Sequence, residues 1–311
     1  MTDQQSPDSQ EKAPAEEPRP GDTLIRGAID MHRHGYPEIS PAQRPSLEDV
    51  DDLARCRDAG MRGVVMKSHV WPTMGRVHHL RERVPGLEIY SSITLNTLSG
   101  GMNPLAVQMA AAQGAKVVFL PTWSSHHDRS RQAMSSRISR ALGIGINDMG
   151  EVITLIDGNG KLTAAAKDVL QVAEENAMVV STGHISIAES LAIAESGILD
   201  NGRLIFAHPD SHSVGASKDQ TLAMASLGCV IEICALGALP PFQRITIAEM
   251  ADLVLGVGPD NCVFTSDYFF DWSPPSAEVL RMVAMLLAET EVGDDGVRSM
   301  LVDVPARLLA T

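Results

Sequence analysis

The sequence has few cysteines, no long hydrophobic run and no excess of positive charge. Its four cysteines, Cys56, Cys229, Cys234 and Cys262, form no Cys-x-x-Cys pair, so we expect buried thiols in a reducing compartment rather than disulfides or a zinc site. No apolar run approaches the length of a membrane-spanning helix, and the start of the chain lacks the apolar stretch of a secretion signal. These absences predict a soluble, cytoplasmic protein that does not bind a membrane.

The charge balance argues against nucleic acid as a partner. The chain carries 25 Lys and Arg against 39 Asp and Glu, a formal net charge of -14, which would repel a polyanion. With 311 residues it can bury a large core without structural metal, so any bound metal is expected to serve chemistry. The expected partner is a small-molecule substrate.

The chain divides into a tail and one folded domain. Residues 1–22 are rich in Pro, Glu, Gln, Asp and Ser and predict a disordered tail, because such a segment buries too little apolar area to offset its ordering entropy. Residues 23–311 alternate apolar and helical segments and predict a single barrel domain. Barrels of this size commonly pair, so a homo-oligomer is compatible with the sequence.

Short apolar segments alternate with helical patterns along the whole domain. Eight of them are candidate strands, at residues 24–30, 63–67, 87–93, 116–120, 178–182, 204–207, 229–234 and 262–266. Continuous apolar runs of this kind suit strands that are buried on both faces of a parallel sheet. Eight strand–helix units with right-handed crossovers predict a closed (β/α)8 TIM barrel. An open doubly wound sheet is the alternative, but the Gly-rich phosphate turn is missing after the first strand.

Two segments after the fourth strand interrupt this alternation. Residues 152–163, with the turn sequence Asp-Gly-Asn-Gly in their middle, predict a small β-hairpin insertion. Before it, residues 128–147 carry four arginines and would overhang the catalytic face of a barrel. We expect those arginines to lie on an ordinary solvated helix, and a lid over an acidic substrate is the alternative.

Histidines and an aspartate stand at the ends of four predicted strands. His32 and His34 end the first strand, and side chains two residues apart in a strand point to the same side. The fifth, sixth and eighth strands end at His184, His208 and Asp267. The carboxyl ends of barrel strands converge on one face, so these five side chains could share a metal site.

With this pattern the sequence resembles the amidohydrolase superfamily, particularly its phosphotriesterase-like and related metal-dependent hydrolases. The resemblance extends from about Thr23 to the end of the chain and depends on Asp30-x-His32-x-His34, His184, His208 and Asp267. It implies that the His-x-His pair and Asp267 hold one metal ion. It also implies that His184 and His208 hold a second ion or assist the first, and that Asp267 takes the proton from metal-bound water.

The metal expected at such a site is a divalent transition metal. A divalent cation lowers the pKa of bound water from 15.7 toward about 7. Imidazole and carboxylate ligands suit zinc best, with manganese, iron, cobalt and nickel as alternatives.

The number of metal ions stays open. Binuclear members of the resembled family usually bridge their metals with a carboxylated lysine or a glutamate after the fourth strand, and neither is present here. Lys67 instead ends the second strand. It could be carboxylated and bridge two metals, or stay cationic and bind a substrate oxyanion. Trp123, His69 and His126 are further candidates for substrate contact. Glu232 lies within an apolar strand and would need a partner that the sequence does not identify.

The function indicated by these residues is hydrolysis of an amide, lactone, cyclic imide or ester by metal-activated water. A non-oxidative decarboxylase on the same barrel is the second possibility, and a catalytically silent ligand-binding barrel is the third. A serine hydrolase is disfavoured because the sequence contains no Gly-x-Ser-x-Gly motif.

Overall fold

The computed structural model describes residues 19–310, so most of the predicted tail lies outside the described residues. Its last residues are described and contact the folded body. Asp22 begins helix α1 (Asp22–Ile25), and its Oδ1 pairs with Nη2 of Arg281 at 2.8 Å. The body described by the structure therefore includes Asp22, one residue before the predicted start of the domain.

Eight strands form one parallel sheet whose order follows the chain. They are β1 (Ile29–His34), β2 (Gly63–Lys67), β3 (Glu88–Thr94), β4 (Ala115–Phe119), β5 (Val179–Ser181), β6 (Leu204–Phe206), β7 (Val230–Cys234) and β8 (Cys262–Thr265). The last strand returns to the first, where the Asp267 backbone N–H donates to the His32 carbonyl at 3.0 Å and that of His34 donates to the Tyr268 carbonyl at 3.2 Å. The predicted (β/α)8 TIM barrel is confirmed.

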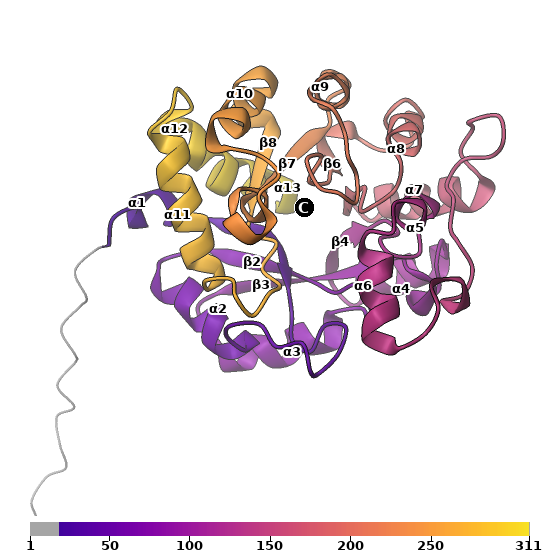
Figure 1. Ribbon diagram of the computed structural model, residues 1–311, viewed down its shortest axis with the longest axis horizontal. Coiled ribbons are helices and arrows are strands. Elements are labelled where there is room, and N and C mark those ends of the chain that lie inside the picture. The colour runs from indigo at the N-terminus through magenta and orange to yellow at the C-terminus, as the bar shows by residue number, and fades with distance from the viewer. Residues whose placement is uncertain (1–18, 311) are drawn as a thin grey trace, which may run out of the picture.

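Helices surround these strands on the outside (Figure 1). Those that follow strands are α2 (Asp49–Asp58), α3 (Met74–Arg83), α4 (Pro104–Ala112), α7 (Ala164–Glu175), α8 (Ile187–Ala194), α9 (Lys218–Ser226), α10 (Ile247–Val257) and α11 (Ser276–Ala288). Capping boxes stabilise the first turn of some of these helices. Ser186 and Glu189 form one at α8, and Thr246 and Glu249 form one at α10. Among the described residues, no helix has the length and apolar character needed to cross a bilayer.

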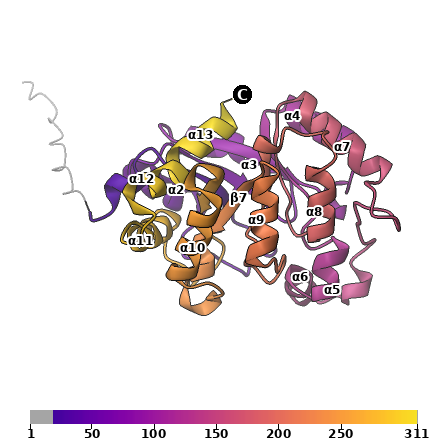
Figure 2. The ribbon, with the colours of Figure 1, turned by 90° about the horizontal axis from the view of Figure 1, so that it is seen from above.

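Four further helices lie outside this alternation. They are α5 (His126–Arg131), α6 (Met134–Leu142), α12 (Gly293–Arg298) and α13 (Val304–Leu309), the last two joined by a π-helical turn at Ser299–Asp303. In Figure 2, α13 lies on the side of the barrel opposite to α5 and α6.

The inside of the barrel is filled at its amino end. Inward-facing side chains, among them Ile29, Val65 and Val263, form one apolar cluster, and α13 adds Val304 and Leu308 to it. A larger apolar cluster lies between the strands and the outer helices. Among the described residues, α13 thus covers the amino end of the barrel, and barrel enzymes carry their active sites at the opposite, carboxyl end.

The first strand begins later than predicted. Residues 24 and 25 belong to α1, and Gly27, at a φ of 82°, turns the chain before β1 starts at Ile29. Leu24 and Ile25 are buried in the outer core, which explains why they look like strand residues in the sequence. The strand then continues through His34, so both histidines of the His-x-His pair lie within it.

The predicted hairpin insertion is present in a reduced form. A single antiparallel bridge joins Ile156 to Leu162, and the Asp157 backbone N–H donates to the Lys161 carbonyl at 2.8 Å. Ile153 pairs with Ser125 instead of continuing the hairpin. The insertion after β4 is therefore a tight turn that is attached to the start of α5.

Candidate metal centre and pocket

Five buried histidines form a ring at the carboxyl end of the barrel. His32 and His34 come from β1, His69 follows β2, His184 follows β5 and His208 follows β6. Neighbouring rings in this circle have centroids 4.6 to 5.7 Å apart. Parallel strands that end at one face of the barrel bring these side chains together, as the strand-end pattern predicts.

Each of the five rings is held from outside through its Nδ1 atom. The contacts are His32 with Glu232 at 2.7 Å, His34 with Glu38 at 3.2 Å, His69 with Thr122 at 2.9 Å, His184 with Asp128 at 2.7 Å and His208 with Ser211 at 2.9 Å. A carboxylate accepts a hydrogen bond from Nδ1–H, so the proton stays on Nδ1 and Nε2 is the basic atom of the ring. Histidines that bind metals are commonly held in this way.

Three of the predicted ligands converge on one point. Nε2 of His32 lies 3.2 Å from Nε2 of His34, and both atoms lie 3.2 Å from Oδ1 of Asp267. Donor atoms bound to one cation at 2.0–2.2 Å lie about 3.0–3.5 Å apart, so this trio fits a divalent metal ion.

Two further groups of side chains have ligand atoms within 4.8 Å of one another. One combines His32 with His208 and Glu232, and the other combines His34 with Glu38 and His69. His208 thus joins a group that shares His32 with the first trio. His184 belongs to the ring of histidines but to none of these three groups.

Asp267 occupies an unusual backbone position. Its φ is 48°, a left-handed conformation that non-glycine residues rarely adopt and that is often found at functional sites. Burial alone would raise the pKa of its carboxyl, but His32 and His34 outweigh burial and hold the pKa well below its usual range. Asp267 is therefore a carboxylate at neutral pH, able to bind a cation or accept a proton.

Lys67 lies directly beside the trio. Its Nζ is 2.9 Å from Nε2 of His32 and 4.8 Å from the centre of the Phe119 ring. Burial lowers the pKa of Lys67, while Asp267 and Glu232 act in the opposite direction. Since Nζ uses the same lone pair of His32 that a metal would use, Lys67 must release His32 when a cation binds there.

Glu232 has the partner that the sequence could not identify. Besides the His32 ring, it accepts hydrogen bonds from the Thr265 hydroxyl at 2.8 Å and from the His208 backbone N–H at 3.0 Å. Burial opposes its ionisation, but the adjacent His32 lowers the pKa of Glu232 to about 2. One buried carboxylate thus positions two of the histidines.

Asp128 plays a similar part for His184, and sequence analysis did not identify it. It accepts from Nδ1 of His184 and from the backbone N–H groups of Met134 at 3.1 Å and Ser135 at 2.7 Å. Burial raises the pKa of Asp128, but His184 and the backbone donors outweigh burial and lower it. Ser125 completes the arrangement, because its hydroxyl donates to the His184 carbonyl at 2.7 Å.

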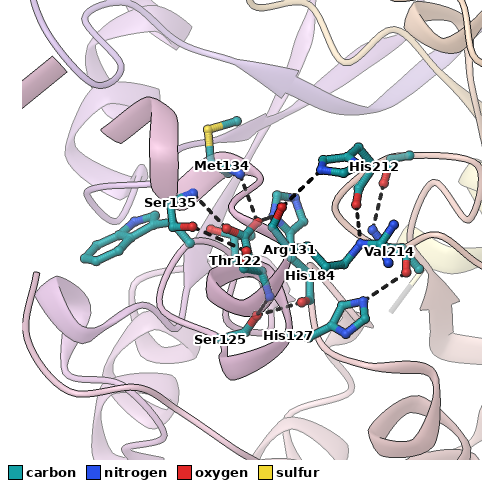
Figure 3. A network of polar contacts seen from close by, with 12 residues as sticks. Thr122, Ser125, His127, Arg131, Met134, Ser135, His184, His212 and Val214 are labelled. Atoms are coloured by element: carbon teal, nitrogen blue, oxygen red, sulfur yellow. Dashed lines mark hydrogen bonds and ion pairs between the residues drawn. The ribbon is translucent and has the colours of Figure 1, made fainter. Parts of the chain in front are cut away.

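The same segment is attached to the loop that follows β6 (Figure 3). Nε of Arg131 donates to the His212 carbonyl at 2.6 Å, and Nε2 of His127 contacts the Val214 carbonyl at 2.9 Å. These contacts place α5 and α6 over the carboxyl end of the barrel, beside the histidines.

A pocket of about 250 Å³ opens above the histidine ring. His34, His69, His184, His208, Lys67 and Asp267 line it on the barrel side. Arg137 from α6 and Arg244, Phe242 and Phe270 from the loops after β7 and β8 also line it. The size suits part of a small molecule.

Two of the residues expected to contact substrate do not line this pocket. Trp123 is buried behind the site, where its Nε1 donates to the His69 carbonyl at 2.8 Å and its ring packs against Ile138. His126 is the first residue of α5 and is exposed, because the chain turns outward there into the helix. His69, the third candidate, does line the pocket.

The expectation for the arginines also needs correction. Arg129 donates to the carbonyls of Met149 and Gly150 at 3.0 Å and connects loops. Arg137 is half-buried and lines the pocket, so the segment is not simply a solvated helix. The reason is that α6 lies across the barrel mouth rather than on the outside.

Comparison with solved structures finds proteins with a similar fold over nearly the whole chain. A Pseudomonas aeruginosa amidohydrolase matches with a TM-score of 0.60 at 10% identity, covering 93% of this chain and 97% of that one. A probable dipeptidase, PvdM, from the same organism matches with a TM-score of 0.58 at 12% identity, covering 93% of this chain and 96% of that one. A putative 2-pyrone-4,6-dicarboxylic acid hydrolase from Pseudomonas putida matches with a TM-score of 0.56 at 13% identity, covering 91% of this chain and 97% of that one. At 10–13% identity these likenesses show the fold, and they agree with the predicted barrel.

Sequence comparison gives a more specific assignment. No curated protein matches this chain. One family model does match, over residues 27–232, which include the five histidines of the ring, Lys67 and Arg137. The matched segment covers more than half of the chain, and the protein therefore belongs to DUF6282, a family of unknown function.

Proposed function

We propose that this protein is a metal-dependent hydrolase that acts on an amide, lactone, cyclic imide or ester of a small molecule. The observation that carries the proposal is the convergence of His32, His34 and Asp267, with 3.2 Å between each pair of ligand atoms. The fold supports the proposal, because active sites of TIM-barrel enzymes lie at this end of the barrel.

The metal we propose is a single zinc ion held by this trio. Two imidazoles and a carboxylate with an open side are a common zinc arrangement for catalysis. Glu232 and Glu38 fix the two imidazoles through Nδ1, so both Nε2 atoms are prepared for a cation. When bound, the ion supplies a Lewis acid for the substrate oxygen and lowers the pKa of water.

The side chains of the site would transfer the proton, stabilise the developing oxyanion and position the substrate. Asp267 accepts a proton from the attacking water and returns it to the leaving nitrogen or oxygen, while water forms the new bond to the carbonyl carbon. Lys67, once released from His32, can donate a hydrogen bond to the oxygen that gains charge during the attack. His184 and His208 line the same pocket and can position the substrate.

Metal analysis combined with product analysis tests this function. We expect purified protein supplied with zinc to retain about one equivalent after gel filtration. A panel of lactones, amides, cyclic imides and esters would then be incubated in isotopically labelled water. Hydrolysis places one labelled oxygen in the acid product, and a chelator should abolish turnover until metal is restored.

Two outcomes would contradict the proposal. Release of carbon dioxide from a carboxylic acid, with no labelled oxygen in the product, would identify a decarboxylase instead. Failure to retain any transition metal after supplementation would favour a barrel that binds a ligand without catalysis.

Replacing Lys67 by Met distinguishes a cationic lysine that binds the substrate oxyanion from a carboxylated lysine that bridges two metals. We expect Lys67→Met to keep its single metal equivalent and to lose roughly 10²- to 10³-fold in kcat, because the donor to the developing oxyanion is gone. The variant Lys67→Met would be compared with Lys167→Met, an exposed lysine on α7, by metal content and kcat. A fall from two metal equivalents to one in Lys67→Met alone would show instead that Lys67 is carboxylated and bridges two metals.

A further inference from the structure

We propose that Arg137 is the receptor for an oxyanion, a carboxylate or a phosphate, carried by the substrate at the outer part of the pocket. This inference deepens the proposed function, because it names the chemical class of molecule that the same pocket accepts. It rests on the contacts of Arg137, on the charge around it and on the cavities that meet there.

Arg137 differs from the other arginines near the pocket in its contacts. Arg131 donates to the His212 carbonyl at 2.6 Å, and Arg244 is paired with Asp210 at 3.3 Å. Within residues 19–310, Arg137 has neither a carboxylate partner nor a hydrogen-bond acceptor, although it is half-buried. A guanidinium in this situation keeps its donors available for a bound anion.

Two aromatic rings hold Arg137 in place. Its guanidinium carbon lies 4.8 Å from the centre of the Phe242 ring and 5.1 Å from that of Phe270. These rings stack on each other with centroids 4.6 Å apart, and Trp272 extends the stack at 5.1 Å from Phe270. These cation–π contacts hold the guanidinium without using its N–H groups, which leaves those groups for a carboxylate or for phosphate oxygens.

The local charge around Arg137 is positive although the chain as a whole is acidic. Burial lowers the pKa of Arg137 and the neighbouring charge of Arg140 lowers it further, while Asp267 acts in the opposite direction and Arg244 again lowers it, so the two arginines outweigh the one carboxylate. The formal net charge of the chain is -14, so this cationic group is a local feature and not an average property. An anion bound here would relieve the mutual repulsion of the arginines.

Arg137 also stands where two cavities meet. It lines the pocket of about 250 Å³ above the histidines and an adjoining cavity of about 450 Å³, and Phe269 and Phe270 line both. Asp267 and Lys67 line only the first. A substrate that places its reacting bond at Asp267 can therefore extend an apolar portion along the phenylalanines and its anion to Arg137.

Binding of simple probes to metal-free protein tests this inference. The probes are benzoate, phenyl phosphate and benzamide, which has the shape of benzoate without its charge. By titration calorimetry we expect at least one of the two anions to bind roughly tenfold or more tightly than benzamide, since hydrogen bonds to charged groups are the strong ones. Whichever anion binds more tightly identifies the group, carboxylate or phosphate.

Variants then assign the binding to Arg137. Arg137→Gln should weaken binding of the preferred anion roughly 10- to 100-fold and leave the affinity for benzamide unchanged. Arg137→Lys keeps the charge and should lose less affinity for the anion. Arg83→Gln, an exposed arginine on α3, is the matched control and should bind as the parent does. Thermal unfolding of each variant checks that it is folded.

Three results would overturn the inference. They are equal binding of benzoate, phenyl phosphate and benzamide, no binding of any probe, and anion binding that survives in Arg137→Gln but is lost in Lys67→Met. Because these measurements need neither metal nor turnover, they can fail while the proposed hydrolase activity stands. They can equally succeed if that activity is absent.

Discussion

The double variant His32→Ala/His34→Ala is expected to retain no transition metal and to show no measurable turnover. The two Nε2 atoms provide two of the three ligands of the proposed site, and Asp267 alone cannot hold a divalent ion against water. Metal content after gel filtration, measured by elemental analysis, checks the first part. Turnover of whichever panel compound the parent protein hydrolyses checks the second.

The matched control is His78→Ala/His79→Ala. These histidines are also neighbours in sequence, but they lie exposed on α3 and should have no effect on metal content or rate. Removing His32 leaves the buried Glu232 without one of its donors, so some loss of stability is expected. If the double variant does not fold, His34→Gln alone should still lower metal affinity. Normal metal content and rate in a folded double variant would place the active site elsewhere.

Asp267→Asn is expected to keep much of the metal and to lose roughly 10²- to 10⁴-fold in kcat, the usual contribution of a general acid–base group. The amide oxygen can still face the cation, but the amide cannot take a proton from water. Asparagine also tolerates the φ of 48° at this position, so the exchange should not disturb the backbone.

The measurements are kcat and metal content, with Asp294→Asn on the exposed side of α12 as the control. Loss of metal and of activity in parallel would make Asp267 a ligand only. Unchanged kcat in the metal-loaded variant would remove it from proton transfer altogether.

Much of the barrel follows from the sequence. The run at residues 63–67 matches β2 in full, and the runs at residues 87–93 and 116–120 match β3 and β4 to within one residue at each end. The first strand was the least accurate prediction, because Leu24 and Ile25 are apolar and buried but belong to a helical turn. Burial alone does not distinguish a strand from a short helix.

The candidate site was predicted in part. The strand ends located His32, His34 and Asp267, whose ligand atoms the structure brings within 3.2 Å of one another. The role of Asp128 was not predicted, because nothing in its own segment indicates that it will meet the ring of His184. Trp123 and His126, which the sequence suggested as substrate contacts, do not line the pocket, since the direction of a loop side chain has no periodicity that a sequence reveals.

The sequence by itself determined which side chains gather at the barrel mouth. Alternation along a strand sends His32 and His34 to the same side, and parallel strands deliver His208 and Asp267 to the same end. The first rule acts within one strand and the second needs only the parallel order of the strands, so neither depends on how individual side chains pack.

Only the tertiary structure decided how those side chains are held and what surrounds them. Glu232 meets His32 across 200 positions of the chain, and Arg137 comes to rest on Phe242 and Phe270 because α6 lies over the barrel mouth. Such contacts depend on how loops and helices pack against one another. No local pattern of residues encodes that packing.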